Sequence, residues 1–371
     1  MRNNVCCIFN LAPHYRDPIY TLMDEELLCD FYFGDKVDTP IKLMNVSKLR
    51  GYKKTVKNKH ILKTGFLWLT GTWKLVFKPY KYYILTGDPY ILSNYLIAFF
   101  GRILNKKVYV WSHGMRGGHS ANQKILFKFF FSICHKVLLY GEHAKDYMLS
   151  EGFNEDKLIP IYNSLNYNKQ LKIREKLTAS VIYSEHFKNN NSVLIYIGRI
   201  QKNKKLDLLI DSMIILKNNG IKCNLVIIGQ DIENTGLESK VKKLQLENQV
   251  WFYGSCYDET QIGKLIFNAD LCVSPGPIGL TAIHAMTYGT PIITNDNYTK
   301  QMPEFEVVIK NKTGDFFKEG DLTDLTSKIS KWINLNPEKR KEIRNNAYSI
   351  IDNKYNTNYQ IKVLKELVNI N

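Results

Sequence analysis

The sequence lacks the marks of a membrane-spanning or secreted protein. No apolar run reaches the ~18 uncharged residues of a transmembrane helix, and residues 1–12 contain no apolar segment followed by a small-residue cleavage site. We therefore expect a cytoplasmic protein without a signal peptide. Its 371 residues, 44% of them hydrophobic, are enough for two domains with cores of their own.

Cysteine is also scarce. The seven cysteines are odd in number and scattered, and none of them has the spacing of metal ligands. Most lie in apolar runs, as is typical of reduced, buried thiols in a cytosolic protein. The cysteines therefore give no indication of a metal site, and we expect neither a metal nor a cofactor.

Acidic residues are in the minority: 35 Asp and Glu stand against 51 Lys and Arg, which gives a net charge of +16. Such an excess suggests a polyanionic partner, namely nucleic acid, anionic lipid or a phosphorylated substrate. Charge alone does not choose among them, and a lysine- and asparagine-rich composition can also arise from codon bias. Because no nucleic-acid-binding module is recognisable, we do not expect nucleic acid as a partner.

The chain alternates between segments of strand and helix character. In both halves, short apolar runs typical of buried strands are followed by amphipathic helical segments. This pattern predicts an α/β fold of two parallel, doubly wound sheets facing each other across a cleft. Residues 168–191 are polar and predict a linker, so the expected domains are 1–180 and 181–355. Residues 35–60 show no clear period and predict a loop or an irregular strand.

One stretch of the second half has the character of an anion site. An apolar run at 269–273 predicts a strand, a turn containing Gly276 follows, and residues 280–288 have the composition of a helix. A strand, a glycine-rich turn and a helix in this order aim free backbone N–H groups at an anion. An ordinary strand-to-helix joint is the alternative. We expect the helix N-terminus, with a diphosphate bound to it, at Gly279, Leu280 and Thr281.

Basic residues follow the first predicted strand of the second half. Arg199 can form a forked pair of hydrogen bonds with phosphate oxygens, and Lys204 adds a point charge. If the sheet is wound as predicted, their loop lies beside the turn at Gly276, and both features point into one crevice. A solvated basic loop is the alternative.

Two further strand ends add candidate ligand contacts. Tyr253 and Gly254 end a strand at the same sheet edge, where backbone groups can meet a nucleobase, although a plain strand end explains them equally well. Glu304 and Glu306 follow a later strand. Their carboxylates could hold sugar or ribose hydroxyls, and a surface acidic loop is the alternative.

In the first half, the loop after the strand predicted at 107–111 holds two histidines, an arginine and three glycines. His113 could donate to a substrate hydroxyl or to a developing charge; a core histidine bonded to backbone is the alternative. Glycines such as Gly114 let a ligand approach the backbone closely. We expect a substrate to bind there, and the other candidate contacts of this half are His14, Arg16 and Arg116.

Aromatic and basic residues gather at 61–80, and the helix predicted at 122–134 has a broad apolar face that carries lysines. Aromatic side chains sit at membrane interfaces, and lysines meet anionic headgroups. These segments could therefore touch an anionic membrane surface, while ordinary burial explains the aromatic residues equally well.

The second half resembles the donor domain of family 4 glycosyltransferases, which are retaining enzymes of the GT-B fold. The resemblance follows the family's order and spacing between residues 198 and 293, and it is weaker in the first half. The motifs that carry it are G-R-I-Q-K-N-K-K-L-D-L-L-I at 198–210, L-V-I-I-G at 225–229, V-W-F-Y-G at 250–254, A-D-L-C-V-S-P at 269–275, G-L-T-A-I-H-A-M-T-Y-G-T-P-I-I at 279–293, W-S-H-G at 111–114 and the Asn-Ser turn at 163–164.

This resemblance implies a nucleotide diphosphate sugar as donor, with its diphosphate on Arg199 and Lys204 and on the helix that starts near Gly279. It implies that these positive groups stabilise the leaving group without a metal. The acceptor would bind near His113, and a closing helix at 356–371 would return to the first domain. Two more candidate donor contacts are Gly198, at the start of the first motif, and Ile278, in the turn between the motifs at 269–275 and 279–293.

The chain departs from the family at one point. The family carries two glutamates, separated by seven residues, where this chain has Gly276 and His284. The first helps to hold the donor sugar and the second the ribose. Glycine offers no side chain, whereas His284 can still hydrogen-bond a ribose hydroxyl. We expect Glu304 or Glu306 to supply the missing carboxylate.

The predicted function is transfer of a sugar, with retained anomeric configuration, to a glycan acceptor carried on a lipid. The product would be a cell-surface polysaccharide such as capsule, O-antigen or lipopolysaccharide, made at the inner face of the cytoplasmic membrane. The missing glutamates leave two alternatives open. One is a non-catalytic GT-B subunit that binds a nucleotide sugar or a partner transferase, and the other is a sugar-nucleotide epimerase.

Overall fold

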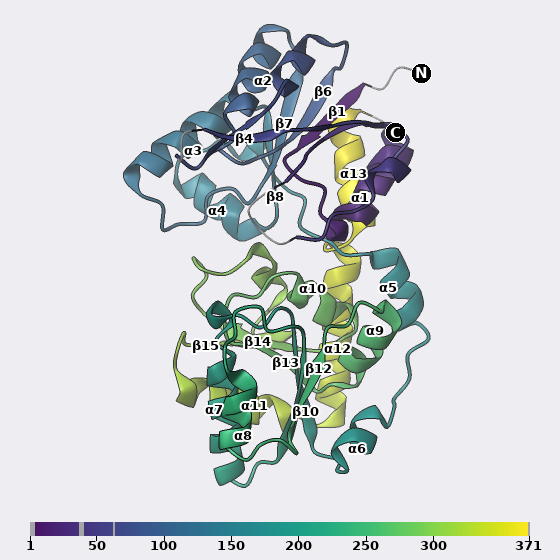
Figure 1. Ribbon diagram of the computed structural model, residues 1–371, viewed down its shortest axis with the longest axis vertical. Helices are drawn as coiled ribbons and strands as arrows, with labels where there is room; N and C mark the ends of the chain where they lie inside the picture. The colour runs from purple at the N-terminus through teal and green to yellow at the C-terminus, as the bar shows by residue number, and fades with distance from the viewer. Residues whose placement is uncertain (1–3, 37–40, 62–63, 370–371) are drawn as a thin grey trace. The chain divides into compact units, whose positions relative to one another are not determined.

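The computed structural model describes residues 4–36, 41–61 and 64–369. The chain divides into two compact units, the first comprising Met1–Asn166 with Asn356–Asn371 and the second Tyr167–Tyr355 (Figure 1). Each unit contains a parallel sheet covered by helices, so the predicted α/β class with two Rossmann-like sheets is confirmed. Residues 167–180, expected in the first domain, belong to the second unit, where α5 (Tyr167–Arg174) packs against α9 (Glu259–Asn268).

The first unit is built on seven strands in the order β3-β2-β1-β6-β7-β8-β9, and their pairings are parallel. The segment expected to be a loop or an irregular strand at 35–60 contributes the edge strand β3 and one strand of an antiparallel hairpin, β4–β5. The strands are β1 (Val5–Phe9), β2 (Asp30–Gly34), β3 (Tyr52–Val56), β4 (Asn58–Ile61), β5 (Phe66–Leu69), β6 (Tyr82–Thr86), β7 (Lys107–Ser112), β8 (Lys136–Leu139) and β9 (Leu158–Pro160).

Helices cover both faces of this sheet and bury a separate core on each. One core includes Met23 and Leu364, on α1 and α13, and the other includes Ile97 and Phe130, on α2 and α3. The closing helix α13 therefore packs within the first unit. The helices are α1 (Asp17–Glu26), α2 (Leu92–Ile103), α3 (Ala121–Ile133), α4 (Glu142–Ser150), α13 (Thr357–Val368) and the 3-10 turns η1 (His14–Arg16), η2 (Val46–Lys48), η3 (Thr72–Phe77) and η4 (Glu155–Lys157).

The second unit has six parallel strands in the order β12-β11-β10-β13-β14-β15. This is the 3-2-1-4-5-6 order of dinucleotide-binding sheets, in which ligands bind beyond the carboxyl ends of the strands where the order reverses. Here that point lies between β10 and β13. The strands are β10 (Ser192–Ile197), β11 (Cys223–Ile228), β12 (Val250–Gly254), β13 (Leu271–Ser274), β14 (Ile292–Asn295) and β15 (Gly314–Phe317).

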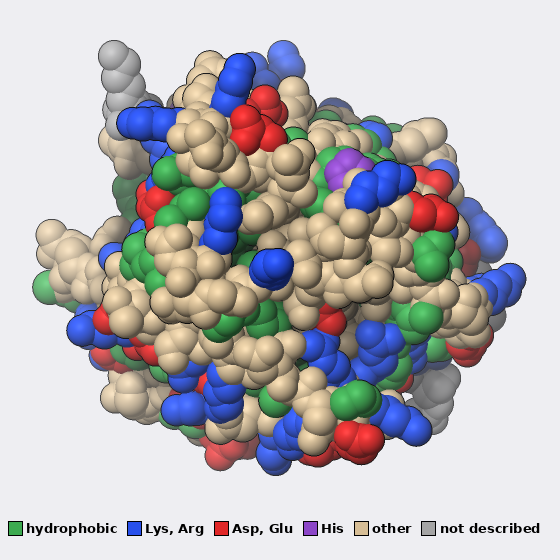
Figure 2. All heavy atoms as spheres, turned by 90° about the horizontal axis from the view of Figure 1, so that it is seen from below, with side chains coloured by type: hydrophobic (Ala, Val, Ile, Leu, Met, Phe, Trp, Pro, Cys, Tyr) green, Lys and Arg blue, Asp and Glu red, His purple; other side chains and the backbone are tan. Residues whose placement is uncertain are grey.

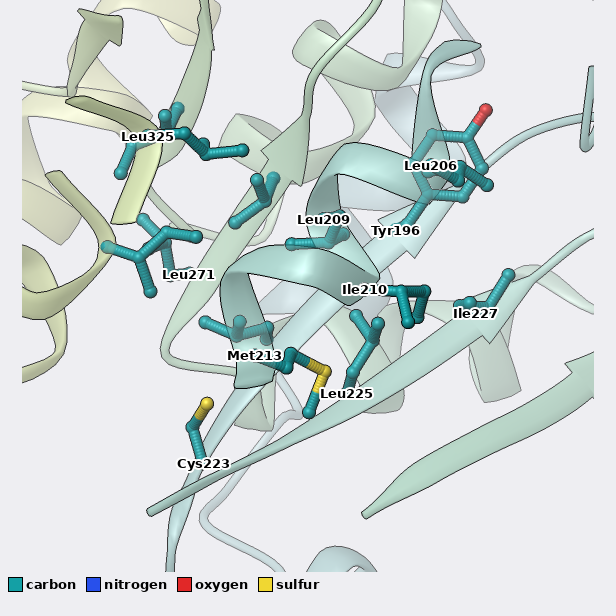
Figure 3. Close-up of a cluster of buried hydrophobic side chains, with 14 of the residues drawn as sticks. Tyr196, Leu206, Leu209, Ile210, Met213, Cys223, Leu225, Ile227, Leu271 and Leu325 are labelled. Carbon is teal, nitrogen blue, oxygen red and sulfur yellow. The ribbon is translucent and has the colours of Figure 1, made fainter. Parts of the chain in front are cut away.

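Helix α7 shows how the sequence pattern creates the core of the second unit. Apolar residues at 206, 209, 210 and 213 recur at helical spacing and therefore lie on one face. Figure 3 shows this face packed on side chains of β10 and β11, among them Tyr196 and Leu225, which are also buried. The helices are α5, α6 (Ile182–Phe187), α7 (Leu206–Asn218), α8 (Leu237–Lys243), α9, α10 (Leu280–Thr287), α11 (Leu322–Ile333), α12 (Pro337–Asn353) and the turns η5 (Lys202–Lys204) and η6 (Pro303–Val307).

Within the part of the chain that the structure describes, no helix has both the length and the apolar character needed to cross a membrane.

Candidate functional site

Two loops meet where the strand order of the second unit reverses. One follows β10 and contains Arg199 and η5, and the other follows β13 and leads through Gly276 into α10. The backbone N–H of Gly276 donates to the carbonyl of Lys204 at 2.9 Å. In return, Nζ of Lys204 donates to the carbonyl of Pro277 at 2.6 Å. The structure therefore brings together the two segments that the sequence suggested as an anion site.

Only glycine fits at position 276. A Cβ built there would lie 2.2 Å from the carbonyl oxygen of Asn203 and 2.6 Å from Cα of Lys204, both backbone atoms. Any side chain would push the loop of η5 away. The lysine-bearing loop thus occupies the space that a glutamate side chain, expected here from the family resemblance, would need.

The positive charges of the site lie close to one another. Burial lowers the pKa of Lys204, the nearby charge of Arg199 lowers it further, and Glu304 raises it. Lys204 is half-buried and Arg199 is exposed. Two cations that repel each other at one place are favourable for binding a di-anion, since the ligand removes the repulsion.

Helix α10 begins beside these cations. Its N-cap is Gly279, which provides no side-chain cap for the first N–H groups of the helix. The hydroxyl of Thr281 donates to the carbonyl of Ile197 at 2.8 Å, which ties the first turn of α10 to the end of β10. The N–H of Ile278 donates to Oε1 of Gln301 at 2.8 Å and its side chain is buried. We therefore assign the free donors to the first turn of α10 and none to Ile278.

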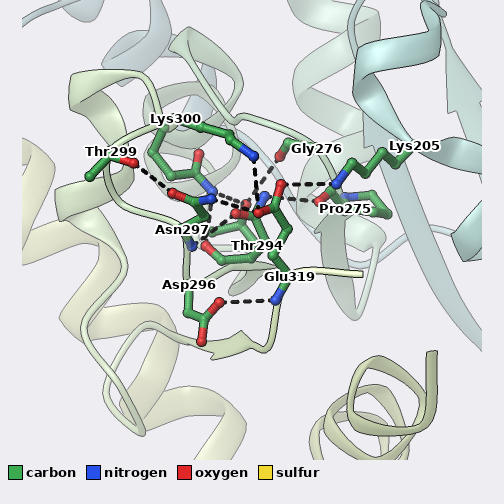
Figure 4. Close-up of polar contacts among 11 residues, drawn as sticks. Lys205, Pro275, Gly276, Thr294, Asp296, Asn297, Thr299, Lys300 and Glu319 are labelled. Carbon is green, nitrogen blue, oxygen red and sulfur yellow. Dashed lines mark hydrogen bonds and ion pairs between the residues drawn. The ribbon is translucent and has the colours of Figure 1, made fainter. Parts of the chain in front are cut away.

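Buried polar side chains that the sequence analysis did not single out hold the turn in place. Nε2 of Gln301 donates to Oγ1 of Thr294 at 3.0 Å and to the carbonyl of Asn295 at 2.9 Å. Nδ2 of Asn295 donates to the carbonyl of Pro275 at 2.9 Å. Figure 4 shows Thr294 next to Pro275 and Gly276. These contacts hold the turn before α10 against the end of β14.

Other basic residues near the turn are already neutralised. Glu319 forms ion pairs with Lys205 at 2.9 Å and with Lys300 at 3.4 Å, as Figure 4 shows. Hydrogen bonds from Asn297 and Lys205 lower the pKa of Glu319 to about 2, so the carboxylate is ionised. Lys204 and Arg199 are therefore better placed than Lys205 and Lys300 to meet an anionic ligand.

The two candidate replacement carboxylates lie in η6. Glu304 is buried, and a Cβ on Gly279 would lie 3.9 Å from its Oε2, which places this carboxylate at the start of α10. Glu306 follows two residues later. Because successive side chains of a 3-10 helix are about 120° apart, the two carboxylates point in different directions. The geometry favours Glu304 over Glu306 as the group beside a donor sugar.

His284 has a carboxylate partner that the sequence analysis missed. Nε2 of His284 lies 2.8 Å from Oε1 of Glu259, which also accepts from the hydroxyl of Tyr288 at 2.8 Å and from Gln170 at 3.0 Å. Burial raises the pKa of Glu259, but the hydrogen bonds, first that of His284, lower it to about 2. Glu259 opens α9 and is 25 residues from His284 in sequence. No local pattern could have paired them.

Tyr253 and Gly254 end β12, which is separated from β10 by β11. At the usual strand spacing, this end lies roughly 10 Å from the reversal point. Gly198 follows β10, and its carbonyl lies where a Cβ on Gly229 would sit, at 1.9 Å, so the ends of β10 and β11 also need glycine. The N–H of Gly229 donates to the carbonyl of Gly254 at 2.9 Å. The end of β12 therefore lies at a distance from the reversal point that suits a nucleoside attached to the diphosphate.

In the first unit, His113 lies at the end of β7 with two arginines near it. Its ring packs 4.7 Å from that of Tyr140, and Arg16 lies over the rings of Trp111 and Tyr140. Surrounding protein, and then the charges of Arg116 and Arg16, lower the pKa of His113 to about 3. The side chain still has an exposed surface. A neutral imidazole is therefore accessible to a ligand.

The other two candidates of the first unit differ in environment. Gly114 has a φ of +64° and a Cβ there would lie 2.6 Å from Cδ2 of Leu139, so this glycine is required by the fold. Nδ1 of His14 lies 3.1 Å from the carbonyl of Lys42, so this ring contacts the loop of Lys42. His113, Arg16 and Arg116 form one group, and His14 is engaged with the loop beyond it.

Residues 182–350 match the family described as glycosyl transferases group 1. Among curated relatives, a capsular polysaccharide biosynthesis glycosyltransferase, CapM of Staphylococcus aureus, is 28% identical over 185 residues, which cover 49% of this chain and 47% of CapM. A GDP-mannose-dependent phosphatidylinositol dimannoside mannosyltransferase of Mycobacterium tuberculosis is 30% identical over 106 residues, covering 28% of this chain and 27% of its own. The chain thus matches less than half the length of these two relatives.

Solved structures resemble the whole chain. HepE of Anabaena, solved in complex with UDP, has a TM-score of 0.74 at 16% identity and is covered over 100% of its length by 99% of this chain. The lipopolysaccharide outer core galactosyltransferase WaaB has a TM-score of 0.70 at 15% identity, with 98% of this chain and 99% of WaaB covered. These similarities confirm the predicted GT-B fold.

Proposed function

We propose that the protein is a retaining glycosyltransferase. It takes a sugar from a nucleotide diphosphate donor and attaches it to a glycan acceptor carried on a lipid, at the inner face of the cytoplasmic membrane, during synthesis of a capsule, O-antigen or lipopolysaccharide. The family match of residues 182–350 supports the reaction class. The capsular relative CapM and the lipopolysaccharide enzyme WaaB support the kind of product.

The observation that carries this proposal is the contact between the loop of Lys204 and the turn of Gly276. It sets one ammonium, with Arg199 beside it, next to the uncapped first turn of α10. When the bond between the anomeric carbon and the diphosphate oxygen breaks, negative charge grows on that oxygen. Fixed positive groups aimed at this position lower the barrier, because they need no rearrangement during the reaction.

The remaining parts of the donor have candidate contacts around this centre. Glu304, beside Gly279, would accept hydrogen bonds from sugar hydroxyls. His284, held by Glu259, would bind a ribose hydroxyl through its second ring nitrogen. The backbone at Tyr253 and Gly254 would meet the base. In the first unit, the neutral ring of His113 would accept a hydrogen bond from the acceptor's hydroxyl. The proton lost by that hydroxyl passes to the departing diphosphate.

Two lysines of η5 provide a matched test. We expect Lys204→Ala to reduce nucleotide diphosphate release from a panel of nucleotide sugars at least about tenfold, because a charge-assisted hydrogen bond contributes about 1.5–3 kcal/mol. Lys202→Ala is the control: Lys202 is exposed, and its contact with Glu233 runs through its backbone N–H, which alanine retains. Equal activity of both variants and the wild type would contradict the proposed site.

A non-catalytic GT-B subunit is the second candidate, because position 276 has no room for the carboxylate found in the family. Such a subunit would bind a nucleotide sugar, as shown by a raised melting temperature, without releasing nucleotide diphosphate when an acceptor is added. An epimerase would convert the donor with no acceptor present. Acceptor-dependent release of nucleotide diphosphate is the result that separates the transferase from both.

A further inference from the structure

The positive charge of the chain is concentrated in one part of the first unit. Residues 39–141 contain 18 Lys and Arg and a single acidic residue, Asp88, a net charge of +17. The rest of the chain has 33 basic and 34 acidic residues (51 − 18 and 35 − 1), a net charge of −1. On the face of the molecule in Figure 2, basic and acidic side chains are interspersed. The excess of +16 therefore reflects one segment, and a uniform codon bias does not account for it.

Large apolar side chains are exposed within this same segment. On α2, the inner face buries Ile97, Ala98 and Gly101, while Phe99 and Ile103, one turn apart, are 55% and 64% exposed. This outward face is apolar although solvent would favour polar residues there. It was not among the segments that the sequence analysis proposed for membrane contact.

Helix α3 continues this surface. Ile125 and Phe129 are also one turn apart on its outer face, and they are 68% and 57% exposed. The ring of Phe129 stacks on that of Tyr95 of α2 with centroids 6.0 Å apart, so the two outward faces are adjacent. Figure 1 shows α2 and α3 on the same side of the first unit.

The turn η3 adds the third element. Phe77 is 57% exposed, and its ring lies 5.5 Å from that of Phe100 on α2. The other aromatic residues expected to face a membrane between 61 and 80 are half-buried; Phe66, for example, packs on Tyr90. Ordinary burial thus accounts for most of these aromatic residues, and Phe77 is the one whose side chain is exposed enough to contact a membrane. We call the exposed side chains of Phe77, Phe99, Ile103, Ile125 and Phe129 the apolar surface.

Basic residues surround the apolar surface. Lys74, Lys78 and Arg102 are exposed on η3, just after it, and on α2. Lys124 and Lys128 of α3 are partly neutralised, because both form ion pairs with Glu151, at 2.6 and 2.8 Å. Neither η3, α2 nor α3 contains an acidic residue. Aromatic and aliphatic side chains rimmed by unopposed cations have the chemistry of a surface that enters the headgroup region of an anionic bilayer.

We propose that the apolar surface docks the first unit on an anionic lipid bilayer. The apolar side chains enter the boundary between headgroups and acyl chains, and the basic rim attracts the lipid phosphates. A second copy of the chain is disfavoured as occupant, because two such surfaces would bring a segment of net charge +17 against itself. This docking is independent of the donor site in the second unit, so it can fail or hold whatever the reaction is.

The test is vesicle flotation of the full chain. We expect binding to vesicles containing phosphatidylglycerol, weaker binding as salt is raised, and little binding to pure phosphatidylcholine. The variant Phe99→Gln with Ile125→Gln should bind at least about tenfold less, since each side chain loses part of the free energy of burial. Its control is Ile232→Gln with Ile309→Gln, which replaces two exposed apolar side chains (41% and 42%) of the second unit.

Charge is tested separately. Lys74→Gln with Arg102→Gln should lower binding to anionic vesicles by about fivefold per charge at low salt, while Lys217→Gln with Lys222→Gln, on the exposed part of the second unit, should not. Unchanged melting temperatures would show that the variants fold. Equal binding of wild type to neutral and anionic vesicles, or equal loss in the controls, would overturn the proposal. The proposal would also be overturned if the wild type were a dimer, the Phe99→Gln, Ile125→Gln variant were a monomer, and both floated equally with the vesicles.

Discussion

Replacement of Gly276 is the most direct test of how the donor site is built. In Gly276→Ala, the new Cβ would lie 2.2 Å from the carbonyl of Asn203 and 2.6 Å from Cα of Lys204. Both are backbone atoms, so no side-chain rotation can relieve the clash. Either the turn after β13 shifts, or the loop of η5 moves away from it.

Both routes have a cost that can be worked out. Forcing an extra methyl group into a packed site costs about 1–3 kcal/mol. If η5 moves, the hydrogen bonds from Gly276 to Lys204 and from Lys204 to Pro277 are lost, at about 1 kcal/mol each. In addition, the ammonium of Lys204 leaves the start of α10. We expect nucleoside diphosphates to bind roughly ten- to a hundredfold more weakly, the equivalent of one charge-assisted hydrogen bond.

Calorimetric titration with UDP and with GDP, together with thermal unfolding, measures both effects. Pro277→Ala is the control, since it changes the same turn, adds no atoms and keeps the carbonyl that Lys204 uses. Gly276→Glu, which restores the family's residue, should bind no better than Gly276→Ala. Wild-type affinity and melting temperature in Gly276→Ala would refute the argument that backbone contact at this position places Lys204.

Three further outcomes follow from the same geometry. Glu259→Gln should lower the free energy of unfolding by about 3 kcal/mol at neutral pH. Because the pKa of Glu259 is lowered to about 2, the difference between variant and wild type should disappear as the pH falls from about 5 towards 2. Unfolding measured over this pH range tests the expectation. His113→Gln should reduce transfer without moving the pH–rate profile between pH 5 and 8, since the pKa of His113 is about 3. Gln301→Ala, which removes three buried hydrogen bonds behind α10, should lower the melting temperature and weaken nucleotide binding together.

Much of the fold could be predicted because its signals are local. Apolar runs and helical periodicity identify β10, α7 and β13 by themselves. Once the sheet is doubly wound, topology alone brings the ends of β10 and β13 together, so the meeting of Lys204 and Gly276 followed from strand order. The boundary between the two units was harder to predict from the sequence. Helix α5 is mostly polar and buries only Tyr167 and Gln170, so its sequence resembles a linker.

Two features of the site could not have been read from the sequence, because they depend on contacts between distant segments. The hydrogen bond between Glu259 and His284 joins the start of α9 to the middle of α10. Nothing near Glu259 in the sequence distinguishes it from a helix N-terminal acid that interacts only with its own backbone. The crowding at Gly276 is equally invisible, since its cause is the backbone of residues 203 and 204. The sequence shows that position 276 is glycine, but it does not show the backbone contact that excludes a side chain there.

That reason changes how the missing glutamate should be understood. A carboxylate at position 276 would hold the η5 loop away and would also add negative charge beside a diphosphate. With glycine, the loop closes in and its lysine binds the carbonyl of Pro277 in the turn. On the proposed function, this exchange strengthens the hold on the leaving group and moves recognition of the sugar to Glu304, on the other side of Gly279. The positive charge of Lys204 then lies at the turn, and the negative charge lies on Glu304 beside Gly279. We therefore expect Glu304→Gln to affect the choice of donor sugar more than the affinity for the free nucleotide.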